Sequence, residues 1–322
     1  MALLEVEHLK MYYKTLRGYV KAVDDISLHV EEKKALGLAG ESGCGKTSAA
    51  LAILRLLPWN AKILEGNIKL SGQNLIEMSD SKFRKEIRWK KISMIFQGAM
   101  NSLHPTFTTG HQIAEAILQH EKITKEEAKE RSEKLIELVG MDRSRADRYP
   151  HELSGGMKQR AVTAMALACN PDLVIADEPT TALDVIVQAQ VLKVMKDLQS
   201  RLDLSMMVIS HDLSLIAETC NDIAIMYAGK VVEYGDVRHI YKEALHPYTE
   251  KLINAFPSVI GAKTELSSIA GFPPDLLKPP PGCRFHPRCQ YAMEICRKKE
   301  PPLIEVDKNH LAACHLQGGE KA

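Results

Sequence analysis

The feature that most constrains the fold is a glycine-rich segment that directly follows a short apolar run. Residues 36–39 (LGLA) are typical of a buried strand, and residues 40–47 continue as GESGCGKT. This matches G-x-x-x-x-G-K-[ST], a strand-to-helix turn whose glycines let successive backbone N–H groups surround phosphates. An ordinary glycine-rich turn would not need the Lys–Thr pair. The candidate phosphate-binding residues are Gly40, Glu41, Ser42, Gly43, Cys44, Gly45, Lys46, Thr47 and Ser48.

Two side chains of this loop have expected roles of their own. We expect Lys46 to reach the outer phosphates of a nucleotide and Thr47 to bind Mg²⁺. Cys44 occupies a variable position of the motif, so we expect no chemistry from its thiol.

A second chemical signal is a pair of carboxylates at the end of an apolar run. Residues 173–177 (LVIAD) predict a buried strand that ends in Asp177, a position suited to holding the metal of a nucleotide. Glu178 follows at once and is the candidate general base, with a purely structural carboxylate as the alternative. Together the two motifs predict a P-loop nucleotide hydrolase.

A third motif lies 23 residues before Asp177, where Ser154, Gly155, Gly156 and Met157 open a helical run. Ser154 as N-cap and two glycines would expose a helix N-terminus, which is a second phosphate-binding surface. One chain with two phosphate surfaces implies that two chains meet around the nucleotide.

The remaining pattern predicts an α/β fold with a mainly parallel sheet. Expected strands at residues 36–39, 91–96, 173–176 and 205–210 alternate with helices, and a helical subdomain spans about residues 98–170. In it, Thr124 and Glu127 have capping-box spacing and Gly140 can end the helix. Residues 223–227 and 230–234 predict a hairpin that closes the main domain, and the proline-rich residues 271–282 predict a linker into a tail.

Charge and hydropathy exclude some functions. The 42 Lys and Arg nearly balance 41 Asp and Glu, which argues against nucleic acid as a partner. No apolar run approaches the ~18 residues that cross a bilayer, and the first ten residues do not resemble a secretory signal, so we expect a cytosolic chain.

The order of these motifs along the chain resembles that of the ATP-binding cassette (ABC) family across roughly residues 3–250. The resemblance implies that Gln97 is the Q-loop residue, which ligates Mg²⁺ and senses the membrane partner. It implies that residues 153–157 are the signature LSGGQ with Met157 in place of Gln, and that residues 182–184 form the D-loop ending in Asp184. His211 resembles the switch histidine that contacts the γ-phosphate. Tyr13 resembles the aromatic residue that stacks on adenine, and Tyr12 competes for this role.

The fold that this resemblance implies is a P-loop ATPase core with an antiparallel β subdomain and an inserted helical subdomain. We expect an ABC ATPase domain at residues 1–250 and a C-terminal extension at residues 251–322. ATP bound to residues 40–47 of one chain would be covered by residues 154–157 of another, and hydrolysis would loosen the pair.

A transporter ATPase is favoured over a soluble ABC ATPase, because no long coiled coil separates Lys46 from Asp177. Residues 97–105 (QGAMNSLHP), 246–249 (HPYT) and 282–289 (GCRFHPRC) resemble the ATPases of dipeptide and oligopeptide importers, and particularly their D-type subunit. That group implies a second ABC ATPase subunit as heterodimer partner, or a homodimer in isolation. It also implies two transmembrane permease subunits, an extracytoplasmic peptide-binding protein and a location at the cytoplasmic face of the membrane. An importer ATPase for sugars or metals stays open as an alternative.

The seven cysteines divide into three scattered ones, at positions 44, 169 and 220, and four in the tail. Cys283, Cys289, Cys296 and Cys314 are spaced C-x5-C-x6-C-x17-C. A small proline-bounded segment cannot fold around a core of its own and needs a further crosslink, and four thiolates could hold a metal centre that provides one. The spacing leaves a 4Fe–4S cluster, Zn²⁺ and reduced thiols or disulfides open. The resemblance implies a 4Fe–4S cluster. Because four thiolates are available as ligands, we expect His286 and His315 to have structural or supporting roles. We expect the basic residues around the site to offset the charge of the thiolates and the cluster; these are Arg284, Arg288, Arg297, Lys298 and Lys299.

Overall fold

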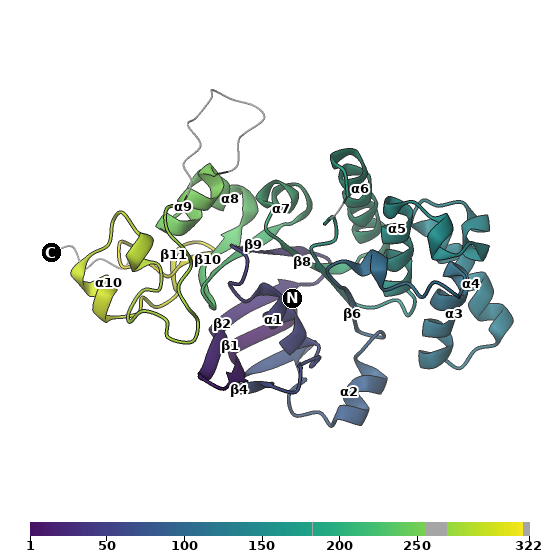
Figure 1. The fold of residues 1–322 in the computed structure, drawn as a ribbon, viewed down its shortest axis with the longest axis horizontal. Helices are drawn as coiled ribbons and strands as arrows, with labels where there is room; N and C mark the ends of the chain where they lie inside the picture. Colours follow the sequence, from purple (N-terminus) through teal and green to yellow (C-terminus); the bar gives the residue numbers. More distant parts are fainter. Residues whose placement is uncertain (182, 256–268, 318–322) are drawn as a thin grey trace. The chain divides into compact units, whose positions relative to one another are not determined.

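The structure is a computed structural model that describes residues 1–181, 183–255 and 269–317 (Figure 1). The chain forms two compact units. Unit 1 comprises Met1, Val30–Ala35 and Glu77–Ile209, and unit 2 comprises Ala2–His29, Leu36–Ile76 and Ser210–Ala322. Each unit contains residues from distant parts of the sequence.

Unit 1 contains a three-stranded parallel arrangement and a group of helices. Its elements are α2 (Asp80–Glu86), β6 (Ile92–Ile95), η1 (Ala99–Asn101), α3 (Thr109–His120), α4 (Lys125–Leu138), η2 (Arg143–Asp147), η3 (Pro150–Glu152), α5 (Gly155–Ala166), β7 (Leu173–Asp177), α6 (Val185–Leu202) and β8 (Ser205–Ser210). Strand β7 pairs with β6 in register Ile92↔Leu173 and with β8 in register Leu173↔Ser205. Because all three strands are parallel, the residues that follow them collect at one edge.

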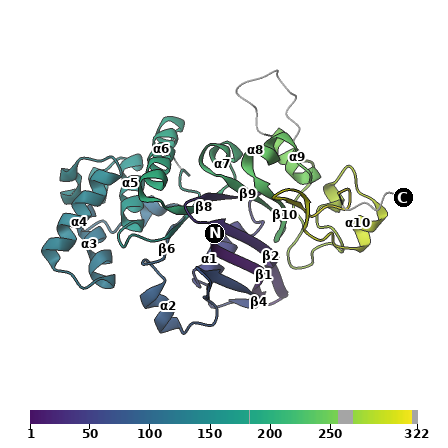
Figure 2. The same cartoon turned by 180° about the vertical axis from the view of Figure 1, so that it is seen from behind.

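The helical part of unit 1 confirms the local signals in the sequence. Helices α3, α4 and α5 lie side by side in both views (Figures 1 and 2). Thr124 and Glu127 form a capping box in which each side chain accepts the other's backbone N–H, at 3.2 and 2.8 Å. Gly140, with φ 74°, follows the end of α4. Ile113, Ile117 and Ile136 are fully buried among these helices.

Unit 2 contains the antiparallel sheet, the strand that precedes the glycine-rich loop, and the C-terminal region. Its elements are β1 (Ala2–Thr15), β2 (Gly18–Glu31), β3 (Ala35–Ala39), α1 (Lys46–Ile53), β4 (Ala61–Leu70), β5 (Gln73–Asn74), α7 (Leu213–Thr219), β9 (Asp222–Tyr227), β10 (Lys230–Asp236), α8 (Val237–Lys242), α9 (Pro247–Asn254), η4 (His286–Arg288), α10 (Glu294–Lys298), β11 (Ile304–Asp307) and β12 (His310–Ala312). The order β2-β1-β4-β5 forms one sheet, and β3 pairs in parallel with β9.

The C-terminal region is part of this fold, which corrects one expectation. The predicted hairpin exists as β9 and β10, but it does not close the domain, because β12 pairs with β10 and β11 pairs with β12. The expected linker, residues 271–282, is hydrogen-bonded to β2, since Lys21 N donates to Leu276 O at 3.0 Å. The tail therefore packs within unit 2: Phe285 is 1% exposed and packs against Tyr227 and Tyr248.

Candidate functional site

The glycine-rich loop of unit 2 adopts a backbone conformation that only glycine accommodates at two positions. Gly40 has φ 147°, and a Cβ there would lie 2.1 Å from Met226 O. Gly45 has φ 110°, and a Cβ there would lie 2.0 Å from Ala22 O. Helix α1 begins directly after Gly45 without a side-chain cap from the described residues. The backbone N–H groups at this helix start are thus available to an anion.

The side chains of the loop divide into a lysine folded over it and a buried thiol beneath it. Lys46 is 6% exposed, and its Nζ donates to Gly40 O at 2.7 Å and to Glu41 O at 3.1 Å. Cys44 is 4% exposed, and burial raises the pKa of its thiol, which makes it unreactive. The expectation that this thiol takes no part in the chemistry stays a prediction. Thr47, the expected Mg²⁺ ligand, is exposed.

The two candidate adenine-stacking tyrosines differ in their hydrogen bonds. The Tyr12 hydroxyl donates to Asp24 Oδ1, and its pKa is raised, first by burial and then by this bond. The Tyr13 hydroxyl lies 3.0 Å from Ser48 Oγ on α1. Tyr13 is therefore the one that stands beside the helix of the phosphate-binding loop, and its stacking role stays a prediction.

In unit 1 the structure brings together two of the predicted catalytic residues. Asp177 ends β7 and is 1% exposed. Glu178 follows it, and its Oε2 accepts hydrogen bonds from Gln97 Nε2 and Thr181 Oγ1, both at 2.9 Å. Gln97 arrives here because it follows β6, the parallel neighbour of β7. The parallel register thus joins residues that are distant in sequence.

The backbone at Glu178 is in a sparsely populated conformation. Its φ is 46°, and its N–H donates to Ile209 O at 2.9 Å on β8. A left-handed conformation in a residue with a side chain costs of order 1–3 kcal/mol and is concentrated at functional sites. Here the turn directs the carboxylate toward Gln97.

The glycines of the third motif stand at the start of α5, as predicted. Ser154 is the N-cap, and its Oγ accepts from Met157 N at 3.4 Å. Ser154 and Gly155 are exposed, so this helix end faces solvent. Gly156 allows close packing on α6, because a Cβ there would lie 2.5 Å from Val187 Cγ1. The geometry suits an anion that approaches from outside the chain.

Two further candidates lie at element ends. Asp184 caps α6, with Oδ1 accepting from Val187 N at 2.9 Å; Ala182 of the expected D-loop lies outside the described residues. His211 follows β8 in the sequence and is exposed. Their functional roles stay predictions.

The four tail cysteines lie close together in the folded chain. All four line one small pocket together with His286 and His315. None of the seven cysteines, all of which lie in the described part of the chain, forms a disulfide. Burial raises the pKa of the Cys283 thiol to about 11, and it also raises the pKa of the Cys289 and Cys314 thiols. Within residues 1–181, 183–255 and 269–317, no three His, Cys, Asp or Glu side chains are arranged as metal ligands.

The flanking histidines hold the pocket by backbone contacts. His286 Nδ1 lies 2.8 Å from Cys283 O, and His315 Nε2 lies 2.8 Å from Lys299 O. The expectation for the flanking arginines was wrong. Arg284 binds Asp24 and Ala228 O, and Arg288 binds Glu41, so both charges are directed at cassette residues. Sequence reasoning missed these partners, although a lone acidic side chain inside a phosphate-binding loop is a signal for a basic one.

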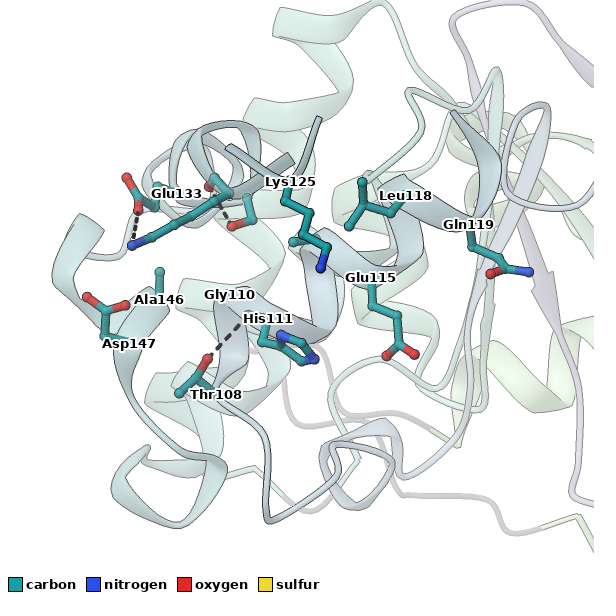
Figure 3. A pocket seen from close by; sticks show the side chains of 13 residues that line it. Thr108, Gly110, His111, Glu115, Leu118, Gln119, Lys125, Glu133, Ala146 and Asp147 are labelled. Carbon is teal, nitrogen blue, oxygen red and sulfur yellow. Dashed lines mark hydrogen bonds and ion pairs between the residues drawn. The ribbon is translucent and has the colours of Figure 1, made fainter. Parts of the chain in front are cut away.

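A separate pocket of about 590 Å³ lies in the helical part of unit 1, between α3, α4 and η2 (Figure 3). His111, Glu115 and Lys125 are among its polar lining residues, and Leu118 and Ala146 are among its apolar ones. None of the predicted nucleotide residues lines it. Across the described residues, no helix combines the length and apolar character needed to cross a membrane.

The chain matches two family models. Residues 23–181 match the ABC transporter family, and residues 232–296 match the oligopeptide/dipeptide transporter C-terminal region. The second match covers Cys283, Cys289 and Cys296 and ends before Cys314.

Curated relatives extend over nearly the whole chain. The oligopeptide transport ATP-binding protein OppD of Bacillus subtilis (strain 168) is 46% identical over 312 residues, covering 96% of this chain and 87% of that protein. The dipeptide transport ATP-binding protein DppD of Escherichia coli (strain K12) is 41% identical over 317 residues, covering 98% and 97%. Among solved structures, the ATP-binding cassette MJ0796, a dimer in a post-hydrolysis state bound to ADP and Pi, has a TM-score of 0.65 at 25% identity, covering 73% of this chain and 99% of that chain. The chain therefore belongs to the ABC transporter ATPases, within the group whose members carry the oligopeptide/dipeptide transporter C-terminal region.

Proposed function

We propose that this chain hydrolyses Mg·ATP as one ATPase subunit of a transporter that imports oligopeptides or dipeptides. The observation that carries the chemical part is the hydrogen bond from Gln97 to Glu178 beside the end of β7. The peptide cargo is supported by the names of the relatives, which are oligopeptide and dipeptide transport proteins over nearly the full chain. Sugars or metals as cargo, and a soluble ABC ATPase, are the alternatives.

The predicted nucleotide residues have separate roles in this proposal. The loop from Gly40 to Thr47 binds the phosphates, and Lys46 leaves its two carbonyl partners to reach the outer ones. Thr47, Gln97 and Asp177 supply the oxygen donors that Mg²⁺ prefers, and the ion when bound offsets phosphate charge. Glu178 accepts the proton of the attacking water.

A second chain completes the site. The exposed start of α5, with Ser154 and Gly155, binds the nucleotide held by the partner, and Asp184 has its proposed role at the same contact. A dimer is supported by the related cassette MJ0796, which was solved as one. The partner is a second ABC ATPase subunit, with a homodimer as the form in isolation. No role for nucleic acid is proposed.

We place the chain at the cytoplasmic face of the membrane, beneath two permease subunits that receive peptides from an extracytoplasmic binding protein. The helical part of unit 1 and the Gln97 loop are the proposed docking surface for a permease segment. Its pocket has the mixed lining of a protein-binding groove, with His111, Glu115 and Lys125 beside apolar residues (Figure 3). Affinity purification from solubilised membranes tests this placement, because recovery of ribosomes or DNA in place of permease subunits contradicts it.

The decisive catalytic test is Glu178→Gln. The variant is expected to retain ATP binding, to lose turnover and to accumulate as an ATP-bound dimer, because the amide cannot accept a proton. Undiminished hydrolysis would remove Glu178 as the base.

We also propose a 4Fe–4S cluster at the four tail cysteines, with zinc as the alternative. Their convergence on one pocket supports a shared ligand, and soft thiolates suit iron–sulfur clusters and zinc alike. Protein purified without oxygen should be brown and contain about four irons per chain. Cys289→Ser should lose the iron, whereas the control Cys220→Ser should keep it; stoichiometric zinc without iron would select the alternative.

A further inference from the structure

A two-pronged ion pair joins the cysteine-bearing tail to the phosphate-binding loop. Arg288 Nη1 lies 2.6 Å from Glu41 Oε2, and Arg288 Nη2 lies 3.0 Å from Glu41 Oε1. The Arg288 side chain is 5% exposed and that of Glu41 is 25% exposed. Two parallel bonds from a guanidinium to a carboxylate fix orientation as well as distance, and burial shields them from solvent.

The rest of the Arg288 guanidinium is also bound. Its Nε donates to Ala270 O at 3.0 Å, and Nη2 donates to Ile269 O at 3.2 Å. Nη1 also reaches the Tyr227 hydroxyl at 3.3 Å. These contacts hold the Arg288 guanidinium in one orientation, and a lysine could not reproduce this hydrogen-bond pattern.

Glu41 connects Arg288 to the proposed nucleotide site. Its N–H donates to the Tyr248 hydroxyl at 2.9 Å, and its carbonyl accepts from Cys44 N at 3.2 Å. The same carbonyl accepts from Lys46 Nζ at 3.1 Å. The position of Glu41 therefore sets the position of the lysine and of the loop N–H groups that follow.

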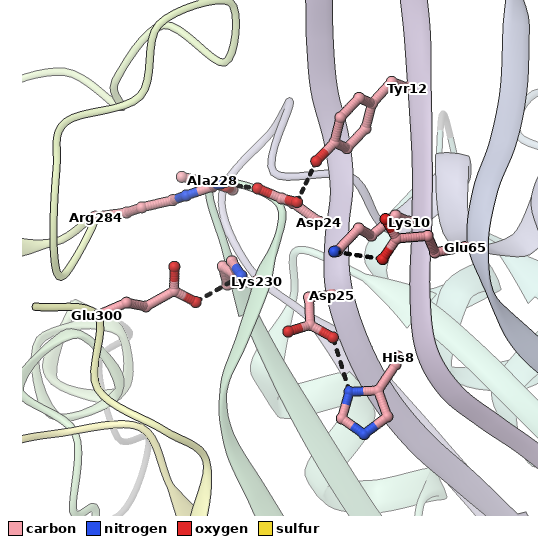
Figure 4. Close-up of polar contacts among 10 residues, drawn as sticks. All are labelled: His8, Lys10, Tyr12, Asp24, Asp25, Glu65, Ala228, Lys230, Arg284 and Glu300. Carbon is pink, nitrogen blue, oxygen red and sulfur yellow. Dashed lines mark hydrogen bonds and ion pairs between the residues drawn. The ribbon is translucent and has the colours of Figure 1, made fainter.

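A second arginine of the same tail segment supports the other side of the loop (Figure 4). Arg284 binds Asp24 Oδ2 and Ala228 O. The next residue, Gly229, donates its N–H to Cys44 O at 2.8 Å. Arg284 and Arg288 flank Phe285, which packs on Tyr227 and Tyr248, so the segment is one packed unit. Cys283 and Cys289 stand at its two ends.

We propose that residues 283–289 position the phosphate-binding loop, with Arg288 acting through Glu41, so that nucleotide affinity depends on the integrity of the cysteine pocket. The inference rests on the proposed function of residues 40–47 as the nucleotide site. Arg288 is a positioning residue: it touches the loop and not the nucleotide. Arg288 directly precedes Cys289 in the chain, so a displacement of Cys289 is expected to displace Arg288 as well.

A double-mutant cycle on the full chain tests the pair. The dissociation constant for ADP is measured by calorimetry in the wild type, Arg288→Gln, Glu41→Gln and the double variant. Each single change is expected to raise the dissociation constant for ADP about tenfold, which corresponds to about 1.4 kcal/mol. The double variant should bind ADP at least as tightly as the single variant that binds it less well. The KM for ATP should rise in parallel in Arg288→Gln, while kcat changes far less, since Arg288 does not touch the reacting atoms.

The controls separate positioning from folding. Arg297→Gln removes the same charge from an exposed residue of α10 and should leave ADP affinity unchanged. If Arg288→Gln unfolds the tail, Glu41→Gln still tests the pair, because Arg288 keeps its carbonyl and hydroxyl acceptors. Wild-type ADP affinity in a folded Glu41→Gln variant, or additive effects in the cycle, overturns the proposal.

The link to the cysteines needs one more cycle. Cys289→Ser should weaken ADP binding in the wild-type background and add nothing in the Glu41→Gln background. An equal loss in both backgrounds contradicts transmission through the ion pair. If Lys46→Ala fails to weaken ADP binding, the proposed nucleotide site itself is wrong; if Lys46→Ala abolishes binding while the Arg288 and Glu41 variants bind normally, only the present inference fails.

Discussion

His310 Nε2 lies 2.7 Å from Glu233 Oε1, and the two side chains are 1% and 0% exposed. His310 is on β12 of the tail and Glu233 on β10, so the contact reinforces the backbone pairing of the two strands. Glu233 also accepts the N–H groups of Leu245 and His246, at 2.8 and 3.0 Å. A carboxylate buried this deeply is stable only while its hydrogen bonds are made.

Removing the histidine should loosen the tail. His310→Ala is expected to reduce the free energy of unfolding by about 1–3 kcal/mol, because the Glu233 carboxylate keeps its two backbone donors but loses its side-chain partner. Urea unfolding measures this. The matched control is His8→Ala, which removes an exposed histidine from its contact with Asp25 and should change stability little. Equal stability of the two variants would contradict a structural role for the buried pair.

Loss of the base should separate binding from turnover. Glu178→Gln is expected to lower kcat by about 10²- to 10⁴-fold, the contribution of a positioned proton acceptor, while ATP still binds. Phosphate release and nucleotide binding are measured on the same preparation. Glu137→Gln, the same exchange at an exposed position of α4, should hydrolyse ATP at the wild-type rate. A loss of binding in Glu178→Gln would point to a structural role.

A carboxylate at position 97 should shift the pH dependence of hydrolysis. In Gln97→Glu two carboxylates meet where Gln97 Nε2 and Glu178 Oε2 are now 2.9 Å apart. Like charges favour sharing one proton, which raises the pKa of the pair, so the acid limb of the rate profile should move to higher pH. Gln97→Met, which loses the hydrogen bond without adding charge, is the control. An acid limb at the same pH in both variants would contradict the contact in the working enzyme.

Crowding the start of α5 should impair dimer formation without impairing the phosphate-binding loop. In Gly156→Ala the new Cβ would lie 2.5 Å from Val187 Cγ1, which has little freedom to move, so α5 and α6 must separate. We expect ATP binding by the single chain to persist and the ATP-bound dimer of the Glu178→Gln background to be lost. Size-exclusion chromatography measures this, and Gly156→Ala with Val187→Ala should restore the dimer. Failure of this second change to rescue would show that the clash is not the cause.

Much of the local structure could be predicted from the sequence because it depends on neighbours in the chain. The Thr124–Glu127 capping box, the Ser154 N-cap and the strand at residues 205–210 are set by spacing of three to five residues and by apolar runs. Gln97 and Glu178 were each predicted to follow a strand of a mainly parallel sheet, but their hydrogen bond was found only in the structure.

Contacts of the tail could not be predicted, because a charge in a sequence does not name its partner. Arg284 and Arg288 stand beside cysteines, so an assignment to the cysteine site was natural; the packing of Phe285 on Tyr227 and Tyr248 instead turns them toward Asp24 and Glu41. Likewise, four cysteines indicate a shared site, but whether their sulfur atoms are arranged as ligands depends on packing.

The sequence by itself determined the phosphate-binding loop, the carboxylate pair and the exposed helix start of α5, since glycine conformations, apolar periodicity and capping act over a few residues. Only the tertiary structure decided that the tail is a strand partner of β10 and a support for Glu41. The physical reason is that long-range ion pairs and strand pairing depend on which apolar faces pack together, and side chains such as Phe285 make that choice only when the chain is folded.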